Sequence, residues 1–384
     1  MGGIIDAPGH TRPTWFQRLL LPGFAFKAVV IGGGYSTGRE LAEFFMPSGP
    51  WGGVGGMLLA TVIWSLVCVV TFLFARATHS LDYRTFFRHL LGPGAIVFEL
   101  AYFAFIIVVL AVFSAAAGAL GAAVFGWPAL YGTLCLMAGI VVFTTFGNTS
   151  VERLFKWVSI LLYATYAAFL LLALVKFGRQ IPIGFSRPAA SDGWAWHGVT
   201  YAAYNILGAA VILPVVRHMT STRDAVTAGL LCGPLAMLPA LVFFVCMCAF
   251  YPQIGGETLP SDFMLRQMSL PLFQVVFQLM IFAALLESGT GCVHAINERI
   301  ATAYRSRRHR ELPNLVRLTA AGVLLVGSVF IATRFGLVTL IANGYRALSY
   351  VILCVYVIPL LTYGIWRLFR RARQSNVVSV APLR

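Results

Sequence analysis

Charged residues are scarce in this sequence. They make up 11% of the 384 residues, against about 25% in soluble globular domains. Hydrophobic residues make up 59%, more than the interior of a soluble protein of this length can bury. The shortage of charge excludes a soluble protein, and it predicts an all-α polytopic membrane protein, because a helix satisfies its own backbone hydrogen bonds inside lipid.

The sequence also lacks the motifs of other classes. Its seven cysteines all lie in apolar segments, so we expect reduced, buried thiols and no disulfide framework. There is no HExxH motif, no set of Ser, His and Asp at membrane depth and no soluble catalytic segment. We therefore expect no enzyme activity and no cofactor. We also expect no cleavable signal, because the first apolar run contains Lys27 and continues into Arg39.

A membrane-spanning helix needs about 20 mostly apolar residues. The sequence contains ten such segments, at about 22–46, 52–75, 93–123, 129–147, 155–176, 196–215, 226–250, 268–297, 314–333 and 337–367.

The basic residues predict the orientation of these segments. With a cytoplasmic N-terminus, twenty of the 28 Lys and Arg residues fall on the inner side, five on the outer side and three within spans. This split agrees with the positive-inside rule and places both termini in the cytoplasm. The basic loops then face the anionic inner leaflet of the lipid bilayer, so we expect no nucleic-acid partner. The sequence leaves the oligomeric state open.

The middle of the first span is a poor helix. It contains Gly32, Gly33 and Gly34, then Gly38, and glycine costs roughly 1 kcal/mol relative to alanine in a helix interior. Backbone that leaves helical geometry inside a membrane must be buried in protein or line a cavity. The run therefore predicts either a binding site or a close helix contact through small residues.

The sixth span is weak as well. It carries Asn205 about 13 Å below its start, with Gly208 and Pro214 beyond it. Spans 1 and 6 each open one half of a ten-helix chain, and they run in opposite directions. Interrupted helices at matching positions indicate an inverted-repeat transporter. We expect a first repeat at about 22–176, a second at about 196–367, and short tails at 1–21 and 368–384.

These features resemble a known fold and a known family. Ten helices with breaks in helices 1 and 6 resemble the LeuT fold of the amino acid–polyamine–organocation superfamily. The stretch Ile31-Gly-Gly-Gly-Tyr-Ser-Thr-Gly-Arg-Glu40 is similar to the glycine-rich signature of the YkvI-type family of bacterial membrane proteins. Glu287-Ser-Gly-Thr-Gly291 and Asn297-Glu-Arg-Ile300 also look like that family.

The resemblance implies transport of a small solute, with alternating access by rocking of helices 1, 2, 6 and 7 against 3, 4, 8 and 9. The positive end of a half-helix attracts a carboxylate, and freed carbonyls accept an ammonium group or a cation. The substrate-binding residues that we expect are Gly32, Gly33, Gly34, Tyr35, Ser36, Thr37, Gly38, Tyr102, Tyr204, Asn205 and Gly208.

Ionisable residues inside a span are costly and mark functional sites. Lys27 and Glu99 lie at similar depths of about 10 Å, so they either form an inner ion pair or extend to the interface. Arg39, Glu40 and Glu43 occupy the outer half of helix 1. By resemblance, Arg346 on helix 10 either pairs with Glu40 or Glu43 in an outer gate or holds a substrate carboxylate.

Helix 8 carries the residues expected to couple transport to an ion. By resemblance, Ser288 and Thr290 ligate sodium together with carbonyls of the broken helix 1, because oxygen ligands suit a hard cation. Glu287 either completes this site or carries a proton. Apart from this sodium site we expect no metal.

We thus expect a secondary active transporter of a small amino acid or amine-like solute in the bacterial inner membrane, coupled to sodium or protons. One alternative is a metal-ion transporter of the same fold, but the chain lacks the Asp-Pro-Gly-Asn motif that such transporters carry in helix 1. The other alternative is a membrane receptor without flux, for which the sequence shows no output domain.

Overall fold

The computed structural model describes residues 13–31, 35–146, 149–308 and 313–371, and every regular element within these residues is helical. Most of the long helices coincide with the apolar runs of the sequence. They are α3 (Gly49–Thr78), α5 (Ala95–Phe125), α6 (Ala129–Phe146), α7 (Thr149–Phe177), α11 (Thr222–Cys248), α13 (Pro271–Arg308) and α14 (Asn314–Thr339).

Shorter helices fill in between. They are α1 (Leu21–Val30), α2 (Arg39–Phe44), α4 (Tyr83–Leu91), α8 (Ile181–Ser186), α9 (Trp194–Asn205), α10 (Leu207–Val211), α12 (Pro260–Met268) and α15 (Arg346–Ile352), joined by the one-to-two-turn segments η1 (Phe16–Leu20), η2 (Tyr35–Thr37), η3 (Met46–Ser48), η4 (Gly92–Gly94), η5 (Leu213–His218), η6 (Gln253–Gly256), η7 (Leu340–Tyr345), η8 (Leu353–Val357) and η9 (Leu360–Gly364).

Six helical stretches of the described residues are long and apolar enough to cross a membrane. Their outer faces carry exposed large apolar side chains such as Val175, Leu272 and Phe330, as expected of surfaces that contact lipid. The chain is thus a multi-pass membrane protein. The ten-helix count and the inverted repeat remain predictions, although Gly336, with a φ of +73°, marks a turn between the expected ninth and tenth spans.

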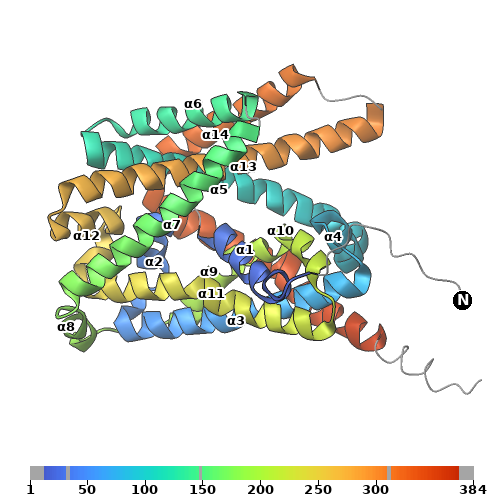
Figure 1. Cartoon of the computed structure of the whole chain (residues 1–384), viewed down its shortest axis with the longest axis horizontal. Helices are drawn as coiled ribbons and strands as arrows, with labels where there is room; N and C mark the ends of the chain where they lie inside the picture. Colours follow the sequence, from blue (N-terminus) through green and yellow to red (C-terminus); the bar gives the residue numbers. More distant parts are fainter. Residues whose placement is uncertain (1–12, 32–34, 147–148, 309–312, 372–384) are drawn as a thin grey trace, which may run out of the picture.

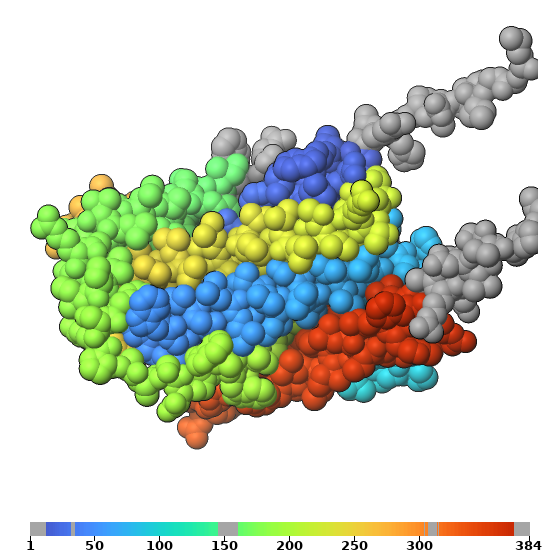
Figure 2. Space-filling view, turned by 90° about the horizontal axis from the view of Figure 1, so that it is seen from below, coloured from blue at the N-terminus to red at the C-terminus, as the bar shows by residue number. Residues whose placement is uncertain are grey.

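The long helices form two groups. In one, α3 packs on α11 and α9, and α1 packs on α11; in the other, α5 packs on α6 and α14, and α13 packs on α5 and α6. Figure 1 shows the two groups one above the other, with α7 crossing them diagonally. In Figure 2, α11 (yellow), α3 (blue) and the last described helices (red) run side by side along one face.

Polar contacts tie the first group together at buried positions. The indole N–H of Trp64 on α3 donates to the carbonyl oxygen of Ala202 on α9 at 3.0 Å. The hydroxyl of Ser349 on α15 donates to the carbonyl oxygen of Thr200 at 2.7 Å. Because these donors are buried and cannot bond to bulk water instead, the contacts fix the position of α9 against its neighbours.

The two ends of the molecule differ. The helix α4 and the last described residues lie at one end of the long axis, and α8 and α12 lie at the other (Figure 1). We call these the α4 end and the α12 end. The helix α4 is amphipathic: Phe86, Phe87 and Leu90 are buried, and the Asp82 side chain accepts a hydrogen bond from the N–H of Thr85 at its start.

Candidate functional site

The first break lies between α1 and α2. The helix α1 ends at Val30, and Ile31 leaves helical geometry with a ψ of 66°. The chain resumes as η2, and Gly38 adopts a φ of +78° before α2 begins. This interruption agrees with the prediction from the glycine run. Gly32, Gly33 and Gly34 lie outside the described residues, so their role as a substrate cradle stays a prediction.

The second break lies where the sequence predicted it. The helix α9 ends at Asn205, α10 follows after Ile206, and the chain continues as η5 around Pro214. Gly208 lies against α1: a Cβ atom there would be 3.2 Å from ring and methyl atoms of Phe26 and Val29. The two broken regions therefore touch each other in the middle of the molecule.

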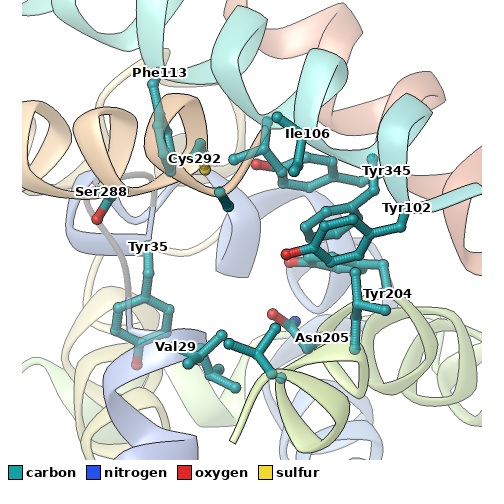
Figure 3. A pocket seen from close by; sticks show the side chains of 18 of the residues that line it. Val29, Tyr35, Tyr102, Ile106, Phe113, Tyr204, Asn205, Ser288, Cys292 and Tyr345 are labelled. Carbon is teal, nitrogen blue, oxygen red and sulfur yellow. The ribbon is translucent and has the colours of Figure 1, made fainter. Parts of the chain in front are cut away.

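A cavity of about 370 Å³ lies at these breaks, between the two helix groups. A cavity of this size is within the range for small-molecule sites. Figure 3 shows its lining side chains pointing inward from both groups. The described lining residues are Ala28, Val29, Val30, Tyr35, Glu40, Tyr102, Phe105, Ile106, Val109, Phe113, Tyr204, Asn205, Leu207, Gly208, Val211, Ser288, Gly291, Cys292, Ala295 and Tyr345.

Five of the residues predicted to bind substrate line this cavity: Tyr35, Tyr102, Tyr204, Asn205 and Gly208. Tyr35 and Tyr204 are almost fully buried. The Asn205 amide nitrogen donates to the carbonyl oxygen of Tyr201 at 3.1 Å, which leaves the amide oxygen as an acceptor beside the cavity. Their role in binding stays a prediction.

The sequence interpretation identified Tyr102 and missed the rest of the apolar and aromatic wall on α5. Five side chains on α5 recur at spacings of three and four residues and so share one helix face: Tyr102, Phe105, Ile106, Val109 and Phe113. That stripe was a readable signal in the sequence. Cys292 on α13 and Tyr345 on η7 carried no comparable signal.

Three other predicted substrate residues do not line this cavity. Ser36 lines a separate cavity of about 240 Å³ between α1, α7 and α11. The Thr37 hydroxyl accepts a hydrogen bond from the N–H of Arg39 at 3.2 Å. A Cβ atom at Gly38 would lie 2.8 Å from the ring of Phe243. The contacts of Thr37 and Gly38 position the start of α2. The geometry of the cavity does not favour substrate contact by Ser36, Thr37 or Gly38.

Glu40 was expected in the outer gate, and the structure places it in the cavity wall instead. Its side chain is buried, and one of its carboxylate oxygens accepts a short hydrogen bond from the Tyr204 hydroxyl. The described residues include no cationic side chain within ion-pair distance of Glu40. The physical reason is the helical turn of α2, which directs Glu40 away from the arginines that flank Glu43.

The α12 end of the cavity is covered by a charged network. Arg39 contacts Glu43 at 2.8 Å and donates to the carbonyl oxygens of Gly255 and Glu257 at 2.9 and 2.8 Å. Arg346, the first residue of α15, contacts Glu43 at 3.7 Å. Of the two pairings considered for Arg346, the structure contains the one with Glu43. The network joins α2 to the η6 segment and to α15, and its gating role stays a prediction.

Of the two alternatives for Lys27 and Glu99, the described residues do not contain the inner ion pair. Glu99 lies 3.2 Å from Arg299 and 3.5 Å from Arg84. The Lys27 ammonium lies 4.9 Å from the ring centroid of Tyr163 on α7. The two side chains have similar depths in the sequence, but they leave their helices toward different neighbours.

Arg299 on α13 lies behind the cavity wall at the α4 end. Its guanidinium carbon lies 3.7 Å from the ring centroid of Tyr102 and 4.4 Å from that of Tyr83. These two rings are themselves 5.7 Å apart and nearly parallel. Arg299 therefore stacks on the outer side of a cavity residue while pairing with Glu99, and it holds Tyr102 in place.

The residues expected to couple an ion, Glu287, Ser288 and Thr290, lie within about one turn of α13. Ser288 lines the cavity, and Glu287 is half-buried beside it. The Thr290 hydroxyl is buried and has no hydrogen-bond partner among the described residues, so it is free to act as a ligand. Residues 32–34 of the broken helix 1 lie outside the described residues, so a sodium site between helix 1 and α13 stays a prediction.

Comparisons with known proteins agree with this geometry. No protein-family model matches the chain. An uncharacterized membrane protein of Bacillus subtilis (strain 168), YkvI, is 23% identical over 346 residues, which cover 85% of this chain and 91% of that one.

Three solved structures are similar in fold. They are MhsT in complex with L-phenylalanine (TM-score 0.58, 15% identity, 90% of this chain and 89% of that one), a Na⁺-coupled sialic acid symporter in a substrate-bound outward-open state (0.56, 13%, 87% and 78%), and a mutant manganese transporter of Eremococcus coleocola (0.51, 14%, 93% and 81%). At these identities the likeness establishes the fold. The chain is similar to YkvI over most of both sequences, and it has the LeuT fold.

Proposed function

We propose that this chain is a secondary active transporter of a small amino acid or amine-like solute, driven by sodium or protons. We place it in the bacterial inner membrane with both termini in the cytoplasm, as the distribution of Lys and Arg favours. The transporter domain comprises two repeats, at about 22–176 and 196–367.

The observation that carries this proposal is the cavity at the two helix breaks. It lies between two separately packed helix groups and is lined by both. Where a helix is broken beside a cavity, some backbone N–H and C=O groups lose their partners within the helix and are available to a ligand. A substrate held there contacts both groups at once, so movement of one group against the other changes the side from which the site is reached.

The charged network favours a conformation closed at the α12 end. Arg39, Glu43 and Arg346 link α2 with η6 and α15 at that end, and the rings of Tyr204 and Tyr345 stack beneath them at 4.6 Å between centroids. Opening the cavity to this end requires these contacts to separate. The alternative conformation would then depend on the Arg299 stack to keep the α4 end closed.

Uptake into proteoliposomes tests the proposal. The purified protein would be supplied with radiolabelled amino acids and amines, with and without a sodium or proton gradient. We expect gradient-dependent uptake of at least one solute. Manganese serves as a negative control, because the described residues contain no group of three or more His, Cys, Asp and Glu side chains that could hold a metal.

Two variants connect the flux to the cavity. Asn205→Ala removes an amide at the cavity wall, and we expect uptake to fall about tenfold or more, the effect of losing one hydrogen bond in a closed site. Asn343→Ala removes an exposed amide on η7 outside the cavity and should leave uptake unchanged. Absence of flux for every solute in folded protein would refute the transport proposal. Equal uptake by both variants would refute the site.

A further inference from the structure

Among the described residues that line the central cavity, Glu40 is the one Asp, Glu, Lys, Arg or His. The other polar groups are tyrosine hydroxyls, an amide, a serine and a thiol. The described lining contains no Lys, Arg or His. The described lining therefore offers a cation one carboxyl group and contains no basic side chain that would compete for it.

The neighbouring arginines do not neutralise Glu40 through direct contact. Arg39 points to the α12 end, where its guanidinium pairs with Glu43 and donates hydrogen bonds to two backbone carbonyl oxygens. Arg346 contacts Glu43 as well. The Glu40 carboxylate accepts a hydrogen bond from the neutral hydroxyl of Tyr204. A buried carboxylate without a counter-ion is unfavourable, and a bound cation removes that penalty.

The walls around Glu40 are aromatic. Tyr204 and Tyr345 stack with 4.6 Å between their centroids, and Figure 3 shows Tyr102 beside them on the same side of the cavity, with Tyr35 across from it. Ring faces attract organic cations, best when both are shielded from water. The ring of Tyr102 already stacks on a cation, Arg299, which does not line the cavity.

From these observations we infer that the cavity binds an organic ammonium ion: the Glu40 carboxylate pairs with the ammonium group, and the aromatic and aliphatic walls cover its hydrocarbon part. A zwitterionic amino acid would bring a second charged group, a carboxylate, for which the described lining contains no cationic side chain. The inference rests on the proposed function, because it takes the same cavity as the substrate site, and it narrows the substrate class to amines.

Matched ligands test the charge requirement on the unaltered protein. Phenethylamine, phenylalanine and 2-phenylethanol share an aromatic body and differ in charge, and 3-methylbutylamine and leucine form a second set. Binding would be measured by thermal shift and by isothermal calorimetry. We expect the amine of each set to bind about tenfold or more tightly than the zwitterion or the alcohol, the effect expected of a charge-assisted hydrogen bond.

Two variants tie the preference to Glu40. Glu40→Gln keeps an acceptor for the Tyr204 hydroxyl and removes the charge, so amine affinity should fall to that of the alcohol. Glu298→Gln alters an exposed carboxylate on α13 outside the cavity, which lies 3.6 Å from Arg317, and should keep the amine preference.

A thiol in the wall gives a readout that needs no substrate. Cys292 lines the cavity, and after the exposed Cys135 and Cys354 are changed to serine it can be modified with a cationic or an anionic methanethiosulfonate reagent. We expect the ratio of cationic to anionic rates to fall severalfold in Glu40→Gln. An unchanged ratio would show that Glu40 does not set the charge of the cavity.

The outcomes separate this inference from the transport proposal. If amino acids bind and are transported while amines are not, the ammonium inference is overturned and the transport function stands. If amines bind through Glu40 but no solute is transported, the inference stands and the transport function fails. If Glu40→Gln keeps amine binding and loses only the sodium or proton dependence of uptake, Glu40 is a coupling group and the inference is overturned.

Discussion

Replacing Glu43 with glutamine is expected to weaken the closure of the cavity at the α12 end. Glu43 contacts Arg39 at 2.8 Å and Arg346 at 3.7 Å, so a single substitution removes both ion pairs. Glutamine has nearly the same shape and keeps one acceptor oxygen. The change therefore tests charge with little effect on packing.

The magnitude depends on the burial of each partner. The Arg39 side chain is 5% exposed, and removing one member of a buried pair costs about 3–5 kcal/mol. Arg39 keeps its bonds to the carbonyl oxygens of Gly255 and Glu257, which lowers the expected cost to about 2 kcal/mol. The Arg346 side chain is 38% exposed, so its pair adds about 0–1 kcal/mol.

A loss of about 2 kcal/mol corresponds to a roughly thirtyfold shift between closed and open conformations. Modification of Cys292, which lines the cavity, by a membrane-impermeant reagent added from the α12 side measures this shift. We expect labelling to accelerate about tenfold or more in Glu43→Gln. Glu257→Gln is the control, because the one ion pair of its side chain among the described residues is with the exposed Arg266 at 4.0 Å. Unchanged labelling together with a lower melting temperature would show that the network stabilises the fold and does not close the cavity.

Two further changes address the α4 end and the helix packing. Arg299→Gln should lower stability by about 1–3 kcal/mol, because it loses the Tyr102 stack and the Glu99 pair, and Arg299→Lys should recover less than half of that in thermal unfolding. Gly198→Ala should cost about 1–3 kcal/mol, since its Cβ would lie 2.5 Å from a backbone oxygen of α3. Gly322→Ala has nothing within 4 Å and is expected to be neutral or stabilising; equal losses in both variants would contradict the packing argument.

The breaks in helices 1 and 6 were predictable because their causes are local. Glycine and proline weaken a helix wherever they occur, so Gly38 and Pro214 mark irregular backbone without reference to the rest of the fold. We expected the two breaks to meet at one site, because they occupy matching positions in the two halves of the chain. Tyr204 and Asn205 then fell in the cavity wall because they lie at the second break.

The ion pairs were harder to predict. Depth along a span follows from counting residues, but the direction of a side chain around the helix axis depends on how the helices pack. Lys27 and Glu99 have similar depths, yet Lys27 lies over Tyr163 and Glu99 meets Arg299. Arg299 was not among the expected gating residues, because it lies just beyond the expected span 268–297 on the cytoplasmic side, where a basic residue needs no special partner.

For Glu40, a helical projection would have predicted the direction of the side chain around the helix axis. Positions 39 and 43 are separated by about 40° around a helix, while position 40 lies about 100° from position 39. Arg39 and Glu43 therefore share a face, and Glu40 cannot join them there. Treating all three as one gate overlooked this periodicity. The same projection applied to α5 aligns Tyr102 with Phe113 on the face that forms the cavity wall. A projection does not show which neighbouring helix each face contacts. The neighbours of α2 in the described structure place aromatic rings, and no cationic side chain, beside Glu40.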